Sequence, residues 1–191
     1  MARIRKFSTM EIFRETERLL LTVGYEAYNI SLLAESLNVS RAAIYKYYTN
    51  KEDLVVDFML DRMAKMIDAF EEIDETKPFI EGLDELLQVI FESKDIHHIL
   101  TMVHWIDLRG KDEIIQKMTK LDVLHKEMYA PLQAMIQKGK EEGLLNEVIP
   151  NALILAFIFQ SIAIPNHTNI PKETFLQSIK MLISTGIYKQ K

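Results

Sequence analysis

Apolar residues recur at helical spacing along almost the whole chain, and this pattern constrains the fold more than any other feature. In the first segment Ile12, Phe13, Thr16, Leu19 and Leu20 share one face, at spacings of three and four residues. We find no convincing run of alternating apolar and polar residues that would predict a strand. Glycine and proline number only six and five among 191 residues, so tight turns should be scarce. The sequence predicts an all-α fold.

Residues that end helices divide this pattern into segments. Gly24 should end the first helix, which begins near Ser8 and continues to Val23. Pro131 is expected to kink or split a long helix that begins near residue 111. We find no internal repeat and no low-complexity linker. The other predicted helices cover about residues 30–37, 41–48, 51–75, 78–92, 95–108, 111–142, 151–164 and 172–188.

The segment from Leu33 to Tyr45 has the proportions of a helix-turn-helix. Ala34 is small enough to let a second helix cross closely, and Asn38 tolerates the left-handed backbone of a tight turn. Ser40 is a suitable N-cap for the second helix, whose first residues would then face a DNA major groove. Many helical hairpins share this pattern, so the segment alone is only moderately specific.

The charge distribution separates a basic start from an acidic remainder. Residues 1–51 carry a net charge of +3, whereas the rest of the chain carries −8. A basic head on an acidic body is expected when only the head meets phosphate, although a small excess can also arise by chance. The chain has no cysteine, which excludes disulfides and thiolate metal sites and fits a cytoplasmic location.

Motifs of the common enzyme classes are absent from the sequence. It has no glycine-rich phosphate loop, no His-Glu-x-x-His and no Gly-x-Ser-x-Gly turn. Asp95 with His97 and His98 might suggest a metal site, but adjacent histidines face different sides of a helix. The apolar run 152–164 is too short to span a membrane. We therefore expect no catalysis, no cofactor, no metal and no membrane association.

The frame around the helix-turn-helix resembles the TetR family of transcriptional regulators over roughly residues 8–56. Four positions depart from the common pattern: Tyr28, Leu32 and the pair Tyr47-Tyr48, where His-Phe is usual. A weaker similarity lies at residues 139–145. The resemblance rests, in this order and spacing, on Ile12-Phe13, Gly24-Tyr25, Ile30, Leu33-Ala34, Val39-Ser40, Ile44-Tyr45 and Lys51-Glu52-Asp53-Leu54.

The resemblance implies a three-helix DNA-binding head at residues 1–51 and a larger helical ligand-binding and dimerisation domain at residues 52–191. Arg41 is the best candidate for base readout, because a guanidinium can bind guanine O6 and N7 together. Ala42 and Ala43 would keep the helix close to the groove. Alternatively, the tyrosines are half-buried packing residues. The predicted DNA-binding residues are Asn29, Ser40, Arg41, Ala42, Ala43, Tyr45, Lys46, Tyr47 and Lys51, with Arg3, Arg5 and Lys6 forming either a basic arm or a solvated tail.

Two features of the remainder predict further partners. The helix near residues 152–164 is apolar nearly all round, which favours a homodimer over an internal core helix, and the last helix would pair in the same interface. By resemblance, a cavity for an unidentified small-molecule effector should lie among the middle helices. An acidic body gives only a weak preference for a cationic ligand. The predicted lining residues are Phe91, Met102, His104, Trp105, Met128 and Tyr129; the alternative for each of them is an ordinary core position.

Together these features predict a repressor that binds a palindromic operator as a dimer and leaves it when a small, mainly apolar ligand binds. The partners would be double-stranded DNA, a second copy of the chain and the effector. The alternative is a non-catalytic helical dimer whose DNA-binding head is degenerate. Activator and repressor share the same head, so the sequence does not separate them.

Overall fold

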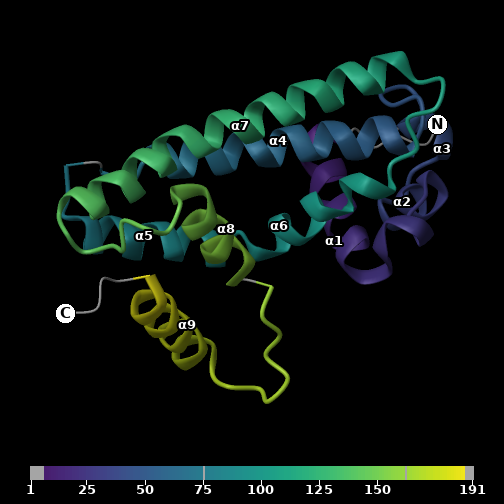
Figure 1. Ribbon diagram of the computed structural model, residues 1–191. Coiled ribbons are helices and arrows are strands. Elements are labelled where there is room, and N and C mark those ends of the chain that lie inside the picture. The colour runs from purple at the N-terminus through teal and green to yellow at the C-terminus, as the bar shows by residue number, and fades with distance from the viewer. Residues whose placement is uncertain (1–6, 75, 162, 188–191) are drawn as a thin grey trace. The chain divides into compact units, whose positions relative to one another are not determined.

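The computed structural model describes residues 7–74, 76–161 and 163–187, and the prediction of an all-α fold is confirmed in this part of the chain (Figure 1). Its helices, in chain order, are α1 (Thr9–Ala27), α2 (Ile30–Ser36), α3 (Arg41–Ile44), α4 (Lys51–Glu71), α5 (Phe79–Glu92), α6 (Lys94–Thr101), the 3-10 helix η1 (Met102–Trp105), α7 (Asp112–Glu141), α8 (Asn151–Ser161) and α9 (Lys172–Ile187).

The chain forms two compact units, and each unit combines two separate stretches of sequence. The first, which we call the head unit, comprises residues 1–64 and 95–123. The second, the body unit, comprises residues 65–94 and 124–191. The helices α4 and α7 therefore each contribute residues to both units. As a result α6, η1 and the first turns of α7 belong to the same compact unit as the N-terminal helices.

Local capping fixes the beginning and end of α1. The side chain of Ser8 accepts a hydrogen bond from the Glu11 amide (3.2 Å), and the Glu11 carboxylate accepts one from the Ser8 amide (2.9 Å). At Gly24 the backbone leaves the helical conformation with φ 75° and ψ 170°, so the expected end after Val23 is confirmed. A short helical turn then resumes and continues to Ala27.

The core of the head unit encloses one polar pair. Tyr28 and Thr16 are both fully buried, and their hydroxyl oxygens lie 2.9 Å apart in a hydrogen bond. Burial raises the pKa of Tyr28, so the phenol stays neutral. The departure from the family pattern at Tyr28 is therefore accommodated, because the buried hydroxyl has a partner. The surrounding buried side chains include Ile12, Leu20, Leu33, Ile44, Leu54 and Phe58.

The predicted end of the third helix was wrong, and of the kink or split predicted at Pro131 the split does not occur. The third helix was expected to reach Tyr48, but α3 ends at Ile44. Beyond it the amides of Tyr47 and Tyr48 both donate to the Ile44 carbonyl, and the chain turns so that Tyr48 enters the core. Pro131 does not split α7, which runs unbroken from Asp112 to Glu141. Burial of Met128 and Leu132 on either side of Pro131 stabilises the helix across this point.

The core of the body unit is built from the apolar faces of α5, α7 and α8. Phe79 begins α5 and is almost fully buried, and its ring lies directly against Gly139 of α7. A glycine is needed there because a β-carbon at position 139 would come within 2.7 Å of the Phe79 ring. The other buried residues of these helices include Leu83, Leu86, Leu87, Ile136, Ile154, Leu155 and Ile158.

Candidate nucleic-acid interface and effector cavity

The helix-turn-helix is built by three local hydrogen bonds, of which the cap at Ser40 was predicted from the sequence. Asn29 caps α2 by accepting from the Leu32 amide (3.0 Å), and Ser40 caps α3 by accepting from the Ala43 amide (3.2 Å). Between the helices Asn38 takes a left-handed backbone with φ 54°, and the Val39 amide then donates to the Ala34 carbonyl (2.9 Å). This turn positions α3 across α2, and the two helices pack closely.

The outer surface of α3 and the turn after it carries polar and aromatic side chains that the core does not use. Tyr45 and Tyr47 are 53% and 59% exposed, so packing does not account for them. Tyr47 keeps its ring 5.5 Å from that of Phe7. The Arg41 guanidinium makes one long contact, 3.5 Å to the Ser31 hydroxyl, and is otherwise exposed. Ala42 and Lys46 are exposed beside them, and Ala43 is partly exposed.

Three of the predicted DNA-binding residues have structural partners in the protein itself. The Lys51 ammonium donates to the carbonyls of Tyr25 (3.1 Å) and Tyr28 (3.2 Å), and it lies 4.3 Å from the centre of the Tyr25 ring. Asn29 and Ser40 are the helix caps already described. Phosphate contacts by these three residues remain predictions. Arg3, Arg5 and Lys6 lie outside the described residues.

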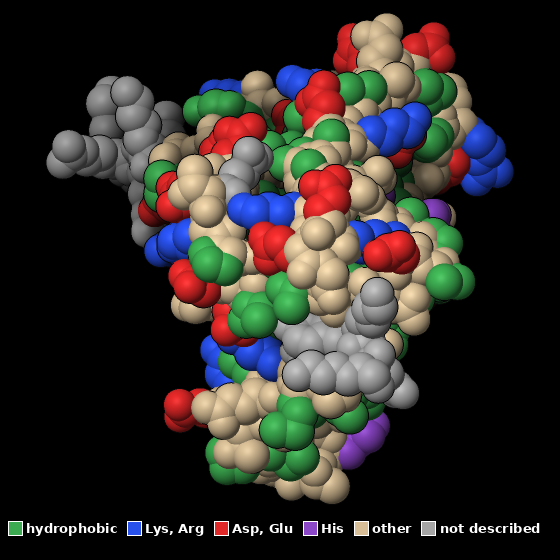
Figure 2. All heavy atoms as spheres, turned by 60° about the vertical axis from the view of Figure 1, so that its left-hand side comes forward, with side chains coloured by type: hydrophobic (Ala, Val, Ile, Leu, Met, Phe, Trp, Pro, Cys, Tyr) green, Lys and Arg blue, Asp and Glu red, His purple; other side chains and the backbone are tan. Residues whose placement is uncertain are grey.

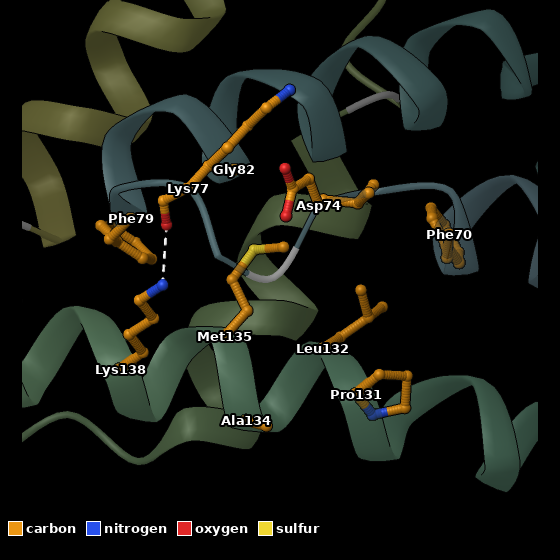
Figure 3. A pocket seen from close by; sticks show the side chains of 11 residues that line it. Phe70, Asp74, Lys77, Phe79, Gly82, Pro131, Leu132, Ala134, Met135 and Lys138 are labelled. Carbon is orange, nitrogen blue, oxygen red and sulfur yellow. Dashed lines mark hydrogen bonds between the residues drawn. The ribbon is translucent and has the colours of Figure 1, made fainter.

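The body unit contains a small cavity between the end of α4, the start of α5 and the middle of α7 (Figure 3). It holds about 130 Å³, and Phe70, Leu132 and Met135 form much of its apolar wall. One end is polar: Lys138 donates to the Lys77 carbonyl (2.7 Å), and the Asp74 carboxylate lies nearby (Figure 3). The arrangement suits a small apolar group that ends in one polar atom.

The polar end of the cavity is held in place by hydrogen bonds. Asp74 accepts from the Thr76 amide (2.9 Å) and hydroxyl (2.6 Å), and these bonds lower its pKa. The Lys77 ammonium pairs with Glu85 and points away from the cavity, as Figure 3 shows, so Lys77 contributes only its carbonyl. The cavity is therefore neither strongly acidic nor strongly basic.

Residues 12–58 match the family model described as "Bacterial regulatory proteins, tetR family". This match covers α1 to α3 and the first turns of α4, and so includes the whole helix-turn-helix. This N-terminal part of the chain is a TetR-family DNA-binding domain. It binds DNA through this helix-turn-helix, and the family consists of regulators rather than enzymes, as the absence of enzyme motifs predicted.

The chain is also similar to regulators along nearly its full length. It is 23% identical to an uncharacterized HTH-type transcriptional regulator of Bacillus subtilis, YhgD, over 86% of this chain and 88% of that protein. The ketosteroid regulator KstR2 of Mycobacterium tuberculosis shares the fold with a TM-score of 0.76, at 15% identity and full coverage of both chains. The FadR regulator of B. subtilis, solved with stearoyl-CoA, is similar to this chain with a TM-score of 0.64 at 22% identity. The match covers 94% of this chain and all of FadR.

The six residues predicted to line the effector site of this regulator do not line the cavity. His104 is exposed and Trp105 is 62% exposed in η1, while Met102 beside them is partly buried. In the body unit Phe91 and Met128 are buried, and the half-buried Tyr129 packs its ring 5.5 Å from that of Phe159. Their role in ligand binding remains a prediction.

Sequence reasoning missed the residues that do line the cavity. Phe70, Phe79 and Leu132 come from three helices and look like ordinary core positions, so no local pattern distinguishes them. The one available signal was the small residue Gly82 on α5, which faces Met135 across the cavity. A glycine in the middle of an apolar helix leaves space that a larger side chain would fill.

The regulator also exposes apolar side chains on its last two helices. Figure 2 shows hydrophobic side chains at the surface in the lower part of that view. No helix in the described part of the chain combines the length and apolar character needed to cross a bilayer. Nor do those residues include a cluster of three His, Asp or Glu side chains that could hold a metal ion. The exposed large apolar residues of α8 and α9 are Leu153, Phe157, Met181 and Leu182.

Proposed function

We propose that this regulator is a repressor that binds a palindromic operator as a homodimer and leaves it when a small, mainly apolar ligand occupies the body unit. The observation that supports the DNA part is the surface of α3 and the turn after it, whose polar and aromatic side chains are largely exposed. Such a regulator would act in the bacterial cytoplasm, where its operator lies. The division into a DNA-binding head at residues 1–51 and a domain for dimer and ligand at 52–191 is part of this proposal.

Within the head, Arg41 is assigned to base readout and its neighbours to positioning. The guanidinium at the start of α3 suits bidentate recognition of guanine, and Ala42 and Ala43 allow close approach to thymine methyl groups. Tyr45, Lys46 and Tyr47 would bind phosphates, which fix register without reading sequence. Asn29, Ser40 and Lys51 would assist mainly by holding the helices in position.

The dimer would form through α8 and α9. The four exposed apolar side chains there leave a surface that water solvates poorly, and packing against a second copy would cover it. A two-fold axis would then present two α3 helices to the two halves of a palindrome.

The cavity of the body unit is the proposed effector site. Its volume of about 130 Å³ is close to the ~150 Å³ of an engineered apolar cavity that binds benzene, so it would take one ring or the end of an apolar chain. A structural relative, FadR of B. subtilis, was solved with stearoyl-CoA, which makes acyl thioesters reasonable probes.

The effector proposal is tested by titrating the operator complex with decanoyl-CoA, stearoyl-CoA and free coenzyme A, following release of labelled DNA. We expect an acylated compound to release the DNA and free coenzyme A to have no effect. Gly82→Leu should abolish release without changing operator affinity, because the leucine would fill the cavity next to Met135. Gly82→Ala is the control that leaves most of the space. Equal release from wild type and Gly82→Leu would contradict the assignment of the cavity, and no release by any probe would exclude acyl thioesters.

The second candidate function is a helical dimer whose head no longer reads a sequence. The departure at Tyr47 favours it, because this residue stands where histidine is usual and its ring lies 5.5 Å from that of Phe7 in a tilted arrangement. Sequence-blind binding of DNA would support this alternative.

A further inference from the structure

Lys117 lies in the second turn of α7, within the head unit, and bridges two carboxylates of α4. Its ammonium is 2.6 Å from Asp53 and 2.7 Å from Asp57. Six residues earlier Lys111 is paired with Glu52 at 3.3 Å. The beginning of α7 is therefore attached by charge to the first turns of α4, although about sixty residues separate the partners in sequence.

Asp53 is also hydrogen-bonded to the turn that follows the helix-turn-helix. Its carboxylate accepts hydrogen bonds from the Thr49 amide (3.0 Å) and the Thr49 hydroxyl (3.2 Å). Its own amide donates to the Asn50 side chain (2.8 Å), which caps α4. Tyr47 and Tyr45, which we assign to phosphate contacts, precede this turn by two and four residues.

The charge on Asp53 depends on these partners. Burial by itself would raise its pKa, but the hydrogen bonds from Lys117 and Thr49 outweigh burial and leave the pKa below the usual value. The carboxylate is therefore ionised at neutral pH and accepts hydrogen bonds from Lys117 and Thr49 at the same time. Without Lys117, Asp53 and Asp57 would face each other unneutralised, one helical turn apart.

We propose that Lys117 is a positioning residue for DNA binding that acts through Asp53. It holds the Thr49-Asn50 turn, and with it the exposed Tyr45 and Tyr47 that follow α3, in the geometry that DNA requires. If the first turns of α7 moved, the Lys117–Asp53 ion pair would move this turn as well. The proposal rests on DNA binding by the helix-turn-helix and does not depend on the effector or the dimer.

The main test compares Lys117→Met with Lys180→Met. Both lysines are 32% exposed and both are ion-paired, since Lys180 lies 3.0 Å from Asp84 in the body unit. Binding is measured on a duplex that the wild-type protein binds saturably. We expect Lys117→Met to weaken binding about tenfold, within the range seen for residues that couple distant elements, and Lys117→Arg to restore it. Lys180→Met should bind like the wild type.

The salt dependence separates positioning from direct contact. A lysine that binds phosphate lowers the slope of log Kd against log salt by about one when it is removed. Because Lys117 is held by two carboxylates, the slope should stay unchanged in Lys117→Met. A reduced slope would overturn the proposal in favour of a direct phosphate contact. Equal weakening in Lys117→Met and Lys180→Met would overturn it in favour of a general role in stability.

Amide hydrogen exchange at Thr49 gives a readout that needs no DNA. The Thr49 amide should exchange about tenfold faster in Lys117→Met, as expected for local opening, while core amides of α5 stay protected. Two further variants leave Lys117 in place. Asp53→Asn should speed this exchange and weaken DNA binding, whereas Asp57→Asn should do neither. Unchanged Thr49 exchange in Lys117→Met, or equal effects of the two aspartate variants, would show that the connection does not run through Asp53.

Discussion

Gly139→Ala is expected to lower the free energy of unfolding by about 2 kcal/mol, the usual cost of overpacking a core. The added β-carbon would lie 2.7 to 2.8 Å from three atoms of the Phe79 ring. One of these atoms is Cγ, at the base of the ring, so relieving the contact requires a shift of the whole buried ring. Alanine favours a helix by about 1 kcal/mol over glycine, but the clash exceeds that gain.

Gly82→Ala is the matched control, because it makes the same chemical change in a neighbouring helix. Its β-carbon would meet the Met135 side chain at 3.7 and 3.9 Å, which is ordinary van der Waals contact. We expect stabilisation of about 0.5–1 kcal/mol from helix propensity. Urea unfolding of both variants, at one protein concentration, measures the difference. If both variants were stabilised, the close packing of α5 against α7 at Phe79 would be wrong.

The double variant Phe157→Glu, Leu182→Glu is expected to be monomeric and to bind the operator at least about 100-fold more weakly. Phe157 is 51% exposed on α8 and Leu182 is 62% exposed on α9, so neither substitution removes a core residue of the protomer. The two added glutamates would make the proposed interface repulsive. A monomer has no linked second head, so it loses the roughly 10²- to 10⁴-fold gain in affinity that avidity provides.

Sedimentation velocity and operator binding together measure this effect. Val148→Glu is the control, because this residue is an exposed apolar side chain in the segment between α7 and α8. It should leave both the sedimentation coefficient and the affinity unchanged. A double variant that remains dimeric would place the interface elsewhere, and a monomer with unchanged affinity would contradict the need for a dimer.

Features that depend on neighbouring residues were predictable from the sequence. The caps at Ser8, Asn29 and Ser40 each involve a bond across three residues, and the left-handed turn at Asn38 is closed by a bond across five, so residue type and spacing determine them. The end of α3 was not predictable in this way. Burial of Tyr48 ends the regular helix, and burial depends on the rest of the head.

Features that depend on distant residues were not predictable. The Lys117–Asp53 pair joins positions 64 residues apart, and Lys117 belongs to no motif that would point to Asp53 as its partner. The cavity likewise arises where α4, α5 and α7 fail to fill space between them. The exposure of His104 and Trp105 was not predictable either, because residue type does not determine which way a side chain faces.

Binding of the purified protein to duplexes that cover the DNA flanking its own gene tests the central claim most directly. The measurement uses competitor DNA, a salt series and two variants: Arg41→Ala and, as control, the exposed Arg109→Ala, whose guanidinium pairs with Asp107. We predict saturable binding of two protomers, or a multiple, to one near-palindromic duplex, weakening as salt rises. Arg41→Ala should lose most of the preference for that duplex, and Arg109→Ala should retain it. Weak binding that ignores sequence and is the same in all three proteins would contradict a sequence-specific regulator.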